Sequence, residues 1–287
     1  MTSTSESQPK SASAVRRAAV VTHGKRAAIG PALARLEKIA SDAGVDLLMP
    51  DEEVEKHGVG EPEQHLETAD IAVVLGGDGT MLRALQRFLG TGVPVIGVNF
   101  GRVGFFAAIR PEELESGLAR VFAGDYRVVE LATLEAETDS VRALAINDVV
   151  TLSAVRGRMV ELGWTVGGED LGIQPCDGMI CATSSGSTAY NLSNGGPVLV
   201  RGVDAMALTF IAAHSLHVRP LVVPRGLEVE IRNETVDVAA SVIADGHAIA
   251  ELSRGATVVV RLGEPRALLA TLPETTFFSR YRETFGS

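Results

Sequence analysis

The sequence predicts an α/β domain with a parallel sheet, followed by a β-rich domain. Up to about Asp125, short apolar runs alternate with segments of helical periodicity, which is the order that a parallel sheet covered by helices requires. Beyond that point, "GLEVEIRN" alternates Leu227, Val229 and Ile231 with charged residues, the pattern of a strand with one wet face. The length of 287 residues agrees with about two domains.

Four buried strands are expected in the first domain. Each is a short apolar run, as in "AAVVTHG" and "DIAVVLGG", without the alternation of a half-exposed strand. They lie at 18–24, 45–49, 70–77 and 93–99. Parallel strands need long crossover connections, so helices are expected between them.

The first of these helices carries Ile29, Leu33, Leu36 and Ala40 at helical spacing, and Gly44 can end it. Apolar residues at this spacing share one face of a helix. That face is expected to cover the sheet.

Two further helices are expected in the first domain. One spans 80–90 and places Leu82, Leu85 and Leu89 on one face. The other spans 111–124, beginning with a proline suited to a first turn and closing with a glycine suited to a helix end.

The second domain shows little helical periodicity before its end. Strands are expected at 159–166, 236–243 and 256–262, paired antiparallel. The segment "TTFFSRYRETF" then places Phe277, Tyr281 and Phe285 on one helical face. We expect this helix to dock its aromatic face onto the first domain.

These patterns predict four parts of the chain. Residues 1–14 are rich in Ser and Thr and are expected to form a disordered tail. Residues 15–125 form the α/β domain, with 266–287 packing back on it, and residues 126–265 form the β-rich domain.

Composition narrows the possible partners and locations. A net charge of −10 argues against a nucleic acid or an anionic membrane as the main partner, while leaving room for a local basic pocket. No signal-peptide core and no run of about 18 apolar residues is present, so we expect a cytoplasmic protein without membrane spans.

Neither the cysteines nor the acidic run indicates a metal site. Cys176 and Cys181 lack neighbouring His ligands, and two cysteines do not make a secreted disulfide scaffold, so small buried residues near a strand are favoured. The acidic stretch 51–55 is interpreted as a solvated loop or helix end.

The stretch "GGDGT" is the first candidate for chemistry. It lies where a predicted parallel strand ends and a helix begins, the position at which open α/β sheets bind ligands. Glycines there let backbone N–H groups approach phosphates, and the helix offers its positive end. No "GK[ST]" follows, and the Gly-x-Gly-x-x-Gly fingerprint is missing, so neither a Walker A loop nor a dinucleotide fingerprint is indicated.

Asp78, at the centre of this stretch, has three possible roles. It could cap the helix in a tight Gly-Asp-Gly turn. A carboxylate beside phosphates is otherwise repelled unless a cation or a proton intervenes. Asp78 could therefore hold Mg²⁺, or accept a proton from a hydroxyl that attacks a phosphoryl group.

Four other stretches combine glycines with polar residues: "GVNFGRVGFF", "AINDVV", "CDGMICATSSGSTAYNLSNGGP" and "ADGHA". Each alone could be a turn. The segment "TSSGSTAY" is denser, because it gathers five hydroxyl side chains around Gly186 with Tyr190 beside them. Such a set suits a ribose, a phosphate or the edge of an adenine.

Taken together and in order, these stretches resemble the NAD kinase family. "GGDGT", "NFGRVGFF", "IND", "CDG", "TSSGSTAYNLSNGGP" and "HSLHVRPLVV" match its pattern from about Ile71 to Val223, and more loosely beyond. Phosphofructokinases, diacylglycerol kinases and sphingosine kinases share similar glycine–aspartate motifs but lack the "GSTAY…GGP" block.

The resemblance implies transfer of phosphate from ATP, or from polyphosphate, to the 2′-hydroxyl of the adenosine ribose of NAD, giving NADP. It implies a Rossmann-like first domain, a β-rich second domain, Mg²⁺ or another divalent cation, and a homodimer or homotetramer. A lipid or sugar kinase that shares the glycine motif is one alternative. A non-catalytic NAD-binding sensor is another.

The resemblance also assigns residues. Asp78 is the expected catalytic carboxylate, and the ATP phosphates are expected on Gly76, Gly77, Gly79 and Thr80. The expected NAD-binding residues are Asp78, Gly79, Arg83, Asn147, Asp148, Arg158, Asp177, Thr188, Ala189, Tyr190, Asn191, Leu192 and Ser193. Asp245 and His247 are possible further contacts, and no residue is assigned as a metal ligand.

The chemistry of these residue types fits the roles. Asp148 and Asp177 can accept hydrogen bonds from ribose hydroxyls or amides, and Tyr190 can stack on a ring. Arg83 and Arg158 offer charge for phosphates, although an exposed helical arginine and a solvated strand end are the alternatives.

The sequence departs from the family pattern at four places. One is "YRVVELATLEAE", which lacks the Glu-Arg-x-x-Leu pattern often seen at the domain junction. "TSSGS" replaces the commoner Thr-Pro-Thr-Gly-Ser, and Gln174–Pro175 stands where many relatives carry a basic residue. His247 stands where relatives often have glutamine; it is either a ligand contact that titrates near neutral pH or a structural histidine in a turn.

Overall fold

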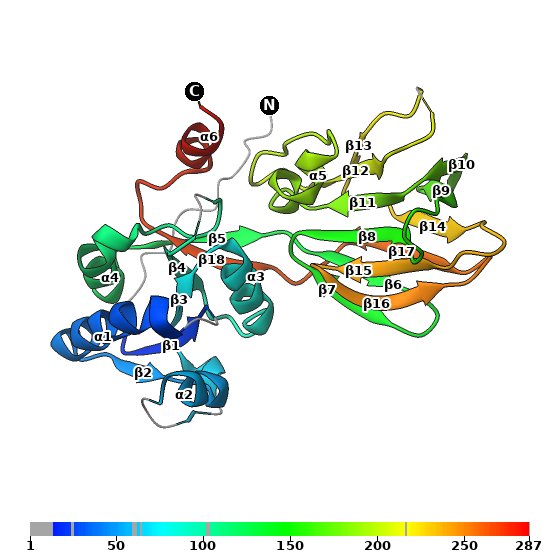
Figure 1. Cartoon of the computed structure of the whole chain (residues 1–287). Helices are drawn as coiled ribbons and strands as arrows, with labels where there is room; N and C mark the ends of the chain where they lie inside the picture. Colours follow the sequence, from blue (N-terminus) through cyan, green and yellow to red (C-terminus); the bar gives the residue numbers. More distant parts are fainter. Residues whose placement is uncertain are drawn as a thin grey trace. The chain divides into compact units, whose positions relative to one another are not determined.

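The computed structural model describes residues 14–23, 26–58, 62–63, 65–101, 104–215 and 217–286. Residues 1–13 of the expected N-terminal tail lie outside this range. The chain divides into two compact units, which are described separately (Figure 1). Unit 1 runs to Glu130 and resumes at Ala267, and unit 2 is Leu131–Arg266.

Unit 1 is built on a six-stranded sheet with the order β2-β1-β3-β4-β18-β5. The first five strands in this order run parallel. The strands are β1 (Arg17–Thr22), β2 (Asp46–Leu48), β3 (Ile71–Gly76), β4 (Val95–Asn99), β5 (Arg127–Leu131) and β18 (Ala267–Thr271). Strand β3 is buried along its whole length, as expected for a strand covered on both faces.

Helices and 3₁₀ turns connect these strands: α1 (Arg26–Ala43), α2 (Asp51–His57), η1 (Leu66–Thr68), α3 (Asp78–Arg87), η2 (Pro111–Glu113) and α4 (Leu114–Phe122). Helix α6 (Phe277–Phe285) follows the last strand. Gly44 follows α1 with a φ of 66° and Gly124 follows α4 with a φ of 87°, the left-handed conformation that suits glycine at a helix end. No described helix is long and apolar enough to cross a membrane.

The apolar face of α3 differs from the expected one. Met81, Ala84 and Leu85 are buried, whereas Leu82 and Leu89 are partly exposed. The helix starts at Asp78, directly after β3, and this start turns Met81 toward β4. A Cβ on Gly97 of β4 would overlap the Met81 sulfur, so glycine is needed for this close approach.

Unit 2 consists of two six-stranded sheets, with the orders β10-β9-β14-β17-β6-β7 and β13-β12-β11-β8-β15-β16. The recorded pairings in both sheets are antiparallel. Side chains of both sheets, such as Leu162, Met179 and Val242, share one core. Cys176 and Cys181 are buried there as free thiols, which confirms the interpretation of the cysteines.

The elements of unit 2 are β6 (Leu134–Glu137), β7 (Arg142–Ala145), β8 (Asp148–Ser153), β9 (Val160–Val166), β10 (Glu169–Cys176), β11 (Gly178–Ala182), η3 (Gly186–Thr188), α5 (Tyr190–Ser193), β12 (Ala205–Ile211), β13 (Leu221–Pro224), β14 (Val229–Asn233), β15 (Ala240–Ala244), β16 (His247–Leu252) and β17 (Thr257–Leu262).

Two strands begin later than expected. The alternation of "GLEVEIRN" predicts Leu227 on the buried face of a strand, but Leu227 is 41% exposed. A turn at Gly226 precedes strand β14, whose pairing starts only at Val229. Val236 is 73% exposed, and the strand expected at 236–243 begins only at Ala240.

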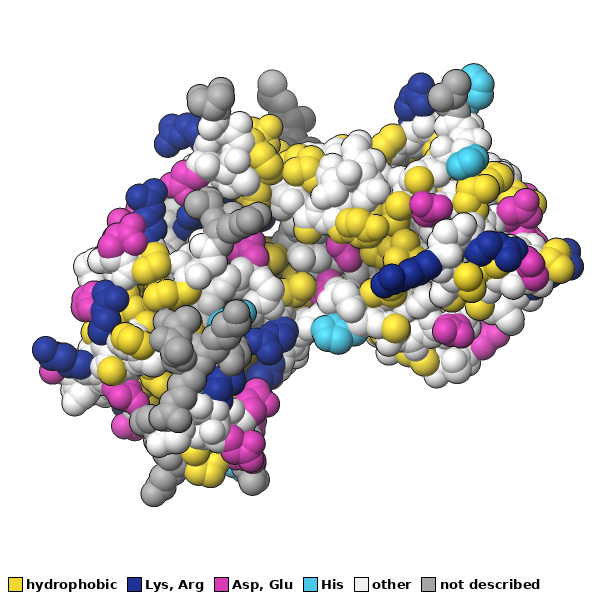
Figure 2. Space-filling model, viewed as in Figure 1, with side chains coloured by type: hydrophobic (Ala, Val, Ile, Leu, Met, Phe, Trp, Pro, Cys, Tyr) yellow, Lys and Arg dark blue, Asp and Glu magenta, His cyan; other side chains and the backbone are white. Residues whose placement is uncertain are grey.

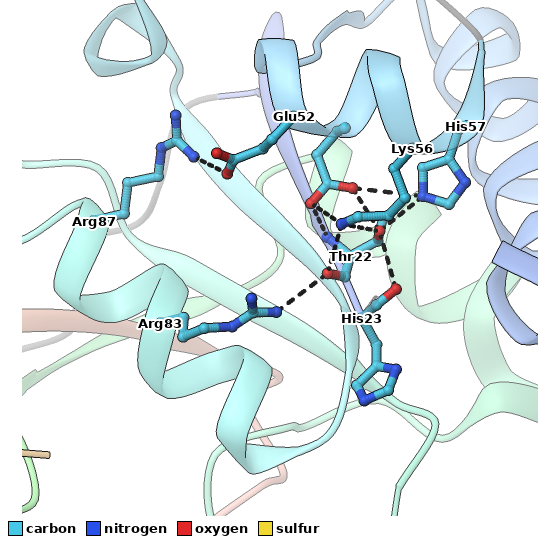
Figure 3. A network of polar contacts seen from close by, with 8 residues as sticks. Thr22, His23, Glu52, Lys56, His57, Arg83 and Arg87 are labelled. Carbon is cyan, nitrogen blue, oxygen red and sulfur yellow. Dashed lines mark hydrogen bonds and ion pairs between the residues drawn. The ribbon is translucent and has the colours of Figure 1, made fainter. Parts of the chain in front are cut away.

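A buried polar network fastens α2 to the end of β1 (Figure 3). The Glu53 carboxylate accepts hydrogen bonds from the Thr22 backbone N–H at 2.9 Å and from the Thr22 hydroxyl at 2.5 Å. Lys56 lies 2.8 Å from the same carboxylate, and the His57 Nε2 atom lies 2.8 Å from the Thr22 hydroxyl. A charge this deeply buried needs such partners.

This network corrects the interpretation of residues 51–55 as wholly solvated. Asp51, Glu52 and Glu55 are exposed, but Glu53 is only 2% exposed. The seven-residue helix α2 carries four carboxylates and turns that of Glu53 inward. The Glu53 carboxylate there holds the carboxyl end of β1. The network therefore fixes one side of the sheet edge at which the candidate site lies.

We predict that Glu53→Ala lowers the free energy of unfolding by about 3 kcal/mol, because it leaves buried donors and the Lys56 ammonium without their acceptor. The matched control is Glu52→Ala, which removes only an exposed ion pair with Arg87 and should cost less than about 1 kcal/mol. Urea unfolding of both variants measures the difference. Equal losses would contradict the role given to Glu53.

Candidate functional site

The "GGDGT" loop lies at the carboxyl edge of the parallel sheet. Strand β3 ends at Gly76, Gly77 is the N-cap residue, and Asp78 begins α3. A Cβ on Gly76 would lie 2.6 Å from the Thr80 hydroxyl oxygen, so this glycine is needed by the packing of the loop. A Cβ on Gly79 would meet nothing within 4 Å. The loop therefore presents open backbone at Gly79, at the positive end of a helix.

Asp78 is held by two backbone amides. One carboxylate oxygen accepts from the Phe105 N–H at 2.8 Å and the other from the Phe106 N–H at 3.2 Å. The close approach requires Gly104, because a Cβ there would overlap the carboxylate. These bonds bind Asp78 to the next loop of the sheet, and Gly77 rather than Asp78 is the cap of α3.

This arrangement resolves the electrostatic difficulty of a carboxylate in a phosphate loop. Two N–H donors and the N-terminus of α3 stabilise the negative charge. Each carboxylate oxygen accepts one of these two hydrogen bonds and retains further acceptor capacity. Asp78 is half-buried, so this capacity remains available at the sheet edge.

Arg83 lies one turn further along α3. Its side chain is exposed, and its guanidinium donates to the Thr22 carbonyl at 3.4 Å (Figure 3). The Lys56 ammonium lies 3.3 Å from the same carbonyl. Two cationic side chains therefore converge on the end of β1.

In unit 2, a second carboxylate holds the turn that contains Asn147 and Asp148. Asp245 accepts from the backbone N–H groups of Ile146 at 2.7 Å, Asn147 at 2.7 Å and Asp148 at 3.1 Å. Asp245 is buried and has a φ of 46°, a strained conformation for a residue other than glycine. Its carboxylate shapes the turn internally.

The hydroxyl-rich segment packs on the same turn. The Thr183 hydroxyl donates to the Ile146 carbonyl at 2.6 Å, and the Thr183 N–H donates to the Asn147 carbonyl at 2.9 Å. A Cβ on Gly186 would overlap the Asn147 backbone. The predicted residues around Asn147 and those that follow Gly186 are thereby brought together.

Two polar atoms of these adjoining turns have no internal partner. The Asn147 amide oxygen and the Ser185 hydroxyl are both buried without a hydrogen bond among the described residues. Buried polar atoms are rarely left unpaired, so such atoms indicate a place where a water or a ligand completes the bonding. Ser185 belongs to the hydroxyl set of "TSSGSTAY" but is not among the residues that the family resemblance assigns.

The segment from Thr188 to Ser193 contains residues of two kinds. The Asn191 amide is wholly buried, donating to the Ser187 carbonyl at 3.1 Å and accepting from the Thr209 hydroxyl at 2.7 Å. Its side chain therefore shapes the segment from within. Tyr190 is 42% exposed and is available to an aromatic ring. Thr188, Ala189 and Leu192 are half-buried, and Ser193 is exposed.

Asp177 lies away from the Asn147–Asp148 turn. Strand β8 pairs with β11 so that Asp148 is opposite Ala182 and Leu152 is opposite Gly178. Asp177, just before Gly178, is therefore at the other end of this strand pair, about 17 Å along it. One ligand would have to extend along the strands to reach both carboxylates.

Arg158 and His247 are both exposed. Arg158 forms an ion pair with Asp237 at 2.8 Å, in the turn before β9. His247 begins β16, directly after the turn formed by Asp245 and Gly246. Neither side chain is held in the buried part of the site.

Burial raises the pKa of Asp148, with the negative charge of Asp245 as the second cause, from an ordinary 3.8 to about 6. Asp148 is 7% exposed. A carboxyl group with this pKa is mostly ionised only above about pH 6. Its capacity to accept hydrogen bonds from a ligand therefore increases as the pH rises through 6.

Lys and Arg side chains do not gather into one surface on the face seen in Figure 2, where dark blue and magenta groups are interspersed. Among the described residues, no group of three or more His, Cys, Asp or Glu side chains is placed to hold a metal ion. Unit 1 thus presents a glycine-rich loop with one carboxylate, and unit 2 presents a polar turn region.

Two family models match most of the chain. The ATP-NAD kinase N-terminal domain matches residues 33–126, and the ATP-NAD kinase C-terminal domain matches residues 146–272. The chain belongs to the NAD kinase family, and the resemblance inferred from its motifs is confirmed.

Relatives and solved structures agree with this assignment. The NAD kinase of Gemmatimonas aurantiaca is 35% identical over 76% of this chain and 77% of its own length. That of Heliobacterium modesticaldum is 37% identical over 78% of this chain and 81% of its own length. An NAD kinase from Archaeoglobus fulgidus in complex with ATP has a TM-score of 0.75, with 28% identity over 94% of this chain and 97% of its own. Yeast NADH kinase complexed with NADH shares the fold, with a TM-score of 0.83 and 22% identity over 95% and 88% of the two chains.

The raised pKa of Asp148 predicts a pH-dependent stability. The folded protein binds this proton more tightly than the unfolded chain, so the contribution is fully present below the ordinary pKa of 3.8 and is lost as pH rises through about 6. Between about pH 5 and about pH 7, this loss should lower the free energy of unfolding of the wild type by about 1 kcal/mol. The Asp148→Asn variant, which has no such proton, should lack this decrease. Urea unfolding at both pH values measures this, with the exposed Asp139→Asn as control. Parallel pH dependence in wild type and Asp148→Asn would contradict the assignment.

Proposed function

We infer that the protein is an NAD kinase, which transfers the terminal phosphoryl group of ATP to the 2′-hydroxyl of the adenosine ribose of NAD and forms NADP. The observation that carries this inference is Asp78, a carboxylate held by two backbone amides in the glycine loop of a chain of this family. In the reaction, the ribose oxygen bonds to the terminal phosphorus, and the bond from that phosphorus to ADP breaks.

The donor phosphates bind to the backbone of the Gly76–Thr80 loop. Gly76, Gly77, Gly79 and Thr80 supply this cradle, and the N-terminus of α3 adds its positive end. The open backbone at Gly79 supports this placement. Arg83 lies on the same helix and offers a guanidinium to phosphate.

A divalent cation, Mg²⁺ by proposal, fits as a companion of the ATP phosphates. The described residues provide no cluster of three ligands, whereas Mg²⁺ commonly takes one or two carboxylates and several phosphate or water oxygens. The acceptor capacity left on the Asp78 carboxylate makes it the candidate protein ligand. When bound, the cation would neutralise charge that develops on the phosphates.

Asp78 orients the attacking hydroxyl and receives its proton. A carboxylate is a far weaker base than a ribose alkoxide, so it does not remove the proton in advance. The proton moves as the new bond between oxygen and phosphorus forms. Most of the rate enhancement then comes from positioning and charge stabilisation.

Unit 2 supplies the proposed contacts to the nicotinamide dinucleotide. Asn147 and Ser185 offer polar atoms without internal partners, Asp148 offers acceptors, and Tyr190 offers a ring for stacking. The remaining proposed contacts are Arg158, Asp177, Thr188, Ala189, Leu192, Ser193 and His247. Asn191 and Asp245 act by shaping the backbone, since their side chains bond internally.

We propose that the chain forms a homodimer or homotetramer. Strands β10 and β13 stand at sheet edges and expose Leu171, Ile173, Leu221 and Val222. Apolar side chains on an open edge favour association with another chain. Sedimentation equilibrium should give a mass of two or four chains; a monomer at micromolar concentration would contradict the proposal.

A substrate screen separates the proposed function from its alternatives. NAD and NADH are each combined with ATP and with polyphosphate, and product is detected with a coupled assay for NADP or NADPH. Phosphorylation of a lipid or a sugar without NADP formation would indicate another kinase. Tight NAD binding without any product would indicate a sensor.

We predict that Asp78→Asn lowers kcat by roughly 10²- to 10⁴-fold, since the amide can neither accept the proton nor carry the charge. Asp42→Asn, which changes an exposed aspartate on α1, is the matched control and should retain wild-type turnover. The measurement is NADP formation with NAD, ATP and Mg²⁺, alongside circular dichroism of each variant. Near wild-type turnover by folded Asp78→Asn would exclude the proposed role.

A further inference from the structure

The loop that holds Asp78 is itself held by the C-terminal helix α6. Phe105 and Phe106 donate their N–H groups to the Asp78 carboxylate. The next two residues, Ala107 and Ala108, present their carbonyls to Arg280 of α6, whose guanidinium donates to them at 2.8 and 2.6 Å. Four consecutive residues therefore connect Arg280 to Asp78.

Arg280 is the buried residue of an otherwise accessible helix. It is 7% exposed, whereas its neighbours Tyr281 and Arg282 are exposed. Arginine is seldom buried unless its charge is paired, and here the Glu283 carboxylate lies 3.0 Å from the guanidinium. Both carbonyls accept from one nitrogen, Nη2, while Nη1 donates to Glu283, so the planar guanidinium holds the carbonyls and the carboxylate in one fixed geometry.

Aromatic packing holds the same loop against the same helix. The Phe105 ring lies 5.8 Å from the Phe277 ring and 5.8 Å from the Phe285 ring, measured between centroids. Both partners belong to α6. At its other end the loop is anchored to β4, where Ile109 pairs with Val98. The residues that donate to Asp78 thus lie between two fixed points.

Resting on the proposed function, we propose that Arg280 is a positioning residue, which sets the Asp78 carboxylate by holding the carbonyls of Ala107 and Ala108. Without the guanidinium, these carbonyls lose this donor, and the peptide groups of Phe105 and Phe106 lose one of their restraints. The Asp78 carboxylate follows its two donors. A displacement of about 1 Å at a reacting group costs on the order of 10²-fold in rate.

The principal test is the kinetics of Arg280→Met. We expect kcat to fall roughly 10- to 100-fold, while KM for NAD changes less than about twofold, because Arg280 acts on the reacting group and not on the NAD contacts of unit 2. The matched control is Arg282→Met, which removes an exposed arginine of the same helix and should leave both constants unchanged. Arg280→Lys keeps the charge without the fork and should give an intermediate kcat; it also serves if Arg280→Met does not fold.

A double variant distinguishes positioning from general destabilisation. In an Asp78→Ala background no carboxylate remains to be positioned, so adding Arg280→Met should change the residual turnover less than about threefold. An equal loss in both backgrounds would show that Arg280 acts on stability alone and would overturn the proposal.

Hydrogen exchange reports on the same loop without catalysis. The amides of Phe105 and Phe106 should exchange faster in Arg280→Met than in wild type, while Arg282→Met should leave them unchanged. This measurement decides the matter where residual turnover of Asp78→Ala is too low to record. Unchanged exchange together with unchanged kcat would exclude the proposal.

The two inferences can fail separately. Wild type that forms no NADP from NAD would contradict the proposed function, whatever Arg280→Met does in exchange. Wild type that forms NADP at the same kcat as Arg280→Met would contradict the role of Arg280 alone.

Discussion

The geometry of the site depends on one interaction, the pair of hydrogen bonds from the Phe105 and Phe106 amides to the Asp78 carboxylate. In the proposed function this carboxylate lies near phosphates, which would compete with it for a cationic side chain. Backbone amides stabilise its charge without this competition. The demand for close approach then explains the glycine at 104, since any side chain there would occupy the place of the carboxylate.

In unit 2, a carboxylate that accepts hydrogen bonds from backbone amides has a different role. Asp245 receives three N–H groups, is buried and adopts a left-handed conformation. Its acceptors are used to fold the turn that carries Asn147 and Asp148, and its charge raises the pKa of Asp148. Asp78 and Asp245 both lie in Asp-Gly sequences, yet one keeps acceptor capacity at an accessible edge and the other spends it inside the protein. Asp78 accepts hydrogen bonds from two backbone amides and Asp245 from three, and this difference distinguishes the accessible carboxylate from the one that shapes a turn.

Much of the fold was predictable because strands β1, β3 and β4 of unit 1 are buried on both faces and therefore appear as continuous apolar runs. The motifs around Asp78 and Gly186 were equally clear, because glycines and hydroxyls are unusual at the end of such runs. Strands β5 and β18 were not predicted, since their register depends on neighbours far along the chain. Glu53 and Arg280 could not be recognised as buried, because a charged residue on a short helix is indistinguishable from its solvated neighbours until its partners are known. For the same reason, the sequence does not reveal that the side chains of Asn191 and Asp245 form internal hydrogen bonds, although both lie in motifs suited to a ligand.

The order in which unit 1 is assembled along the chain has a consequence for its biosynthesis. Strand β18 and helix α6 follow the whole of unit 2, and the Arg280–Ala107 bond joins residues 173 positions apart. During translation, the first four strands emerge with the edge of β4 unpaired and wait for the segment that covers it. Such an edge is exposed to aggregation until the segment arrives. The same C-terminal segment closes the sheet and holds the Phe105–Ala108 loop. We therefore expect the loop that holds Asp78 to become ordered only after the end of the chain has been made.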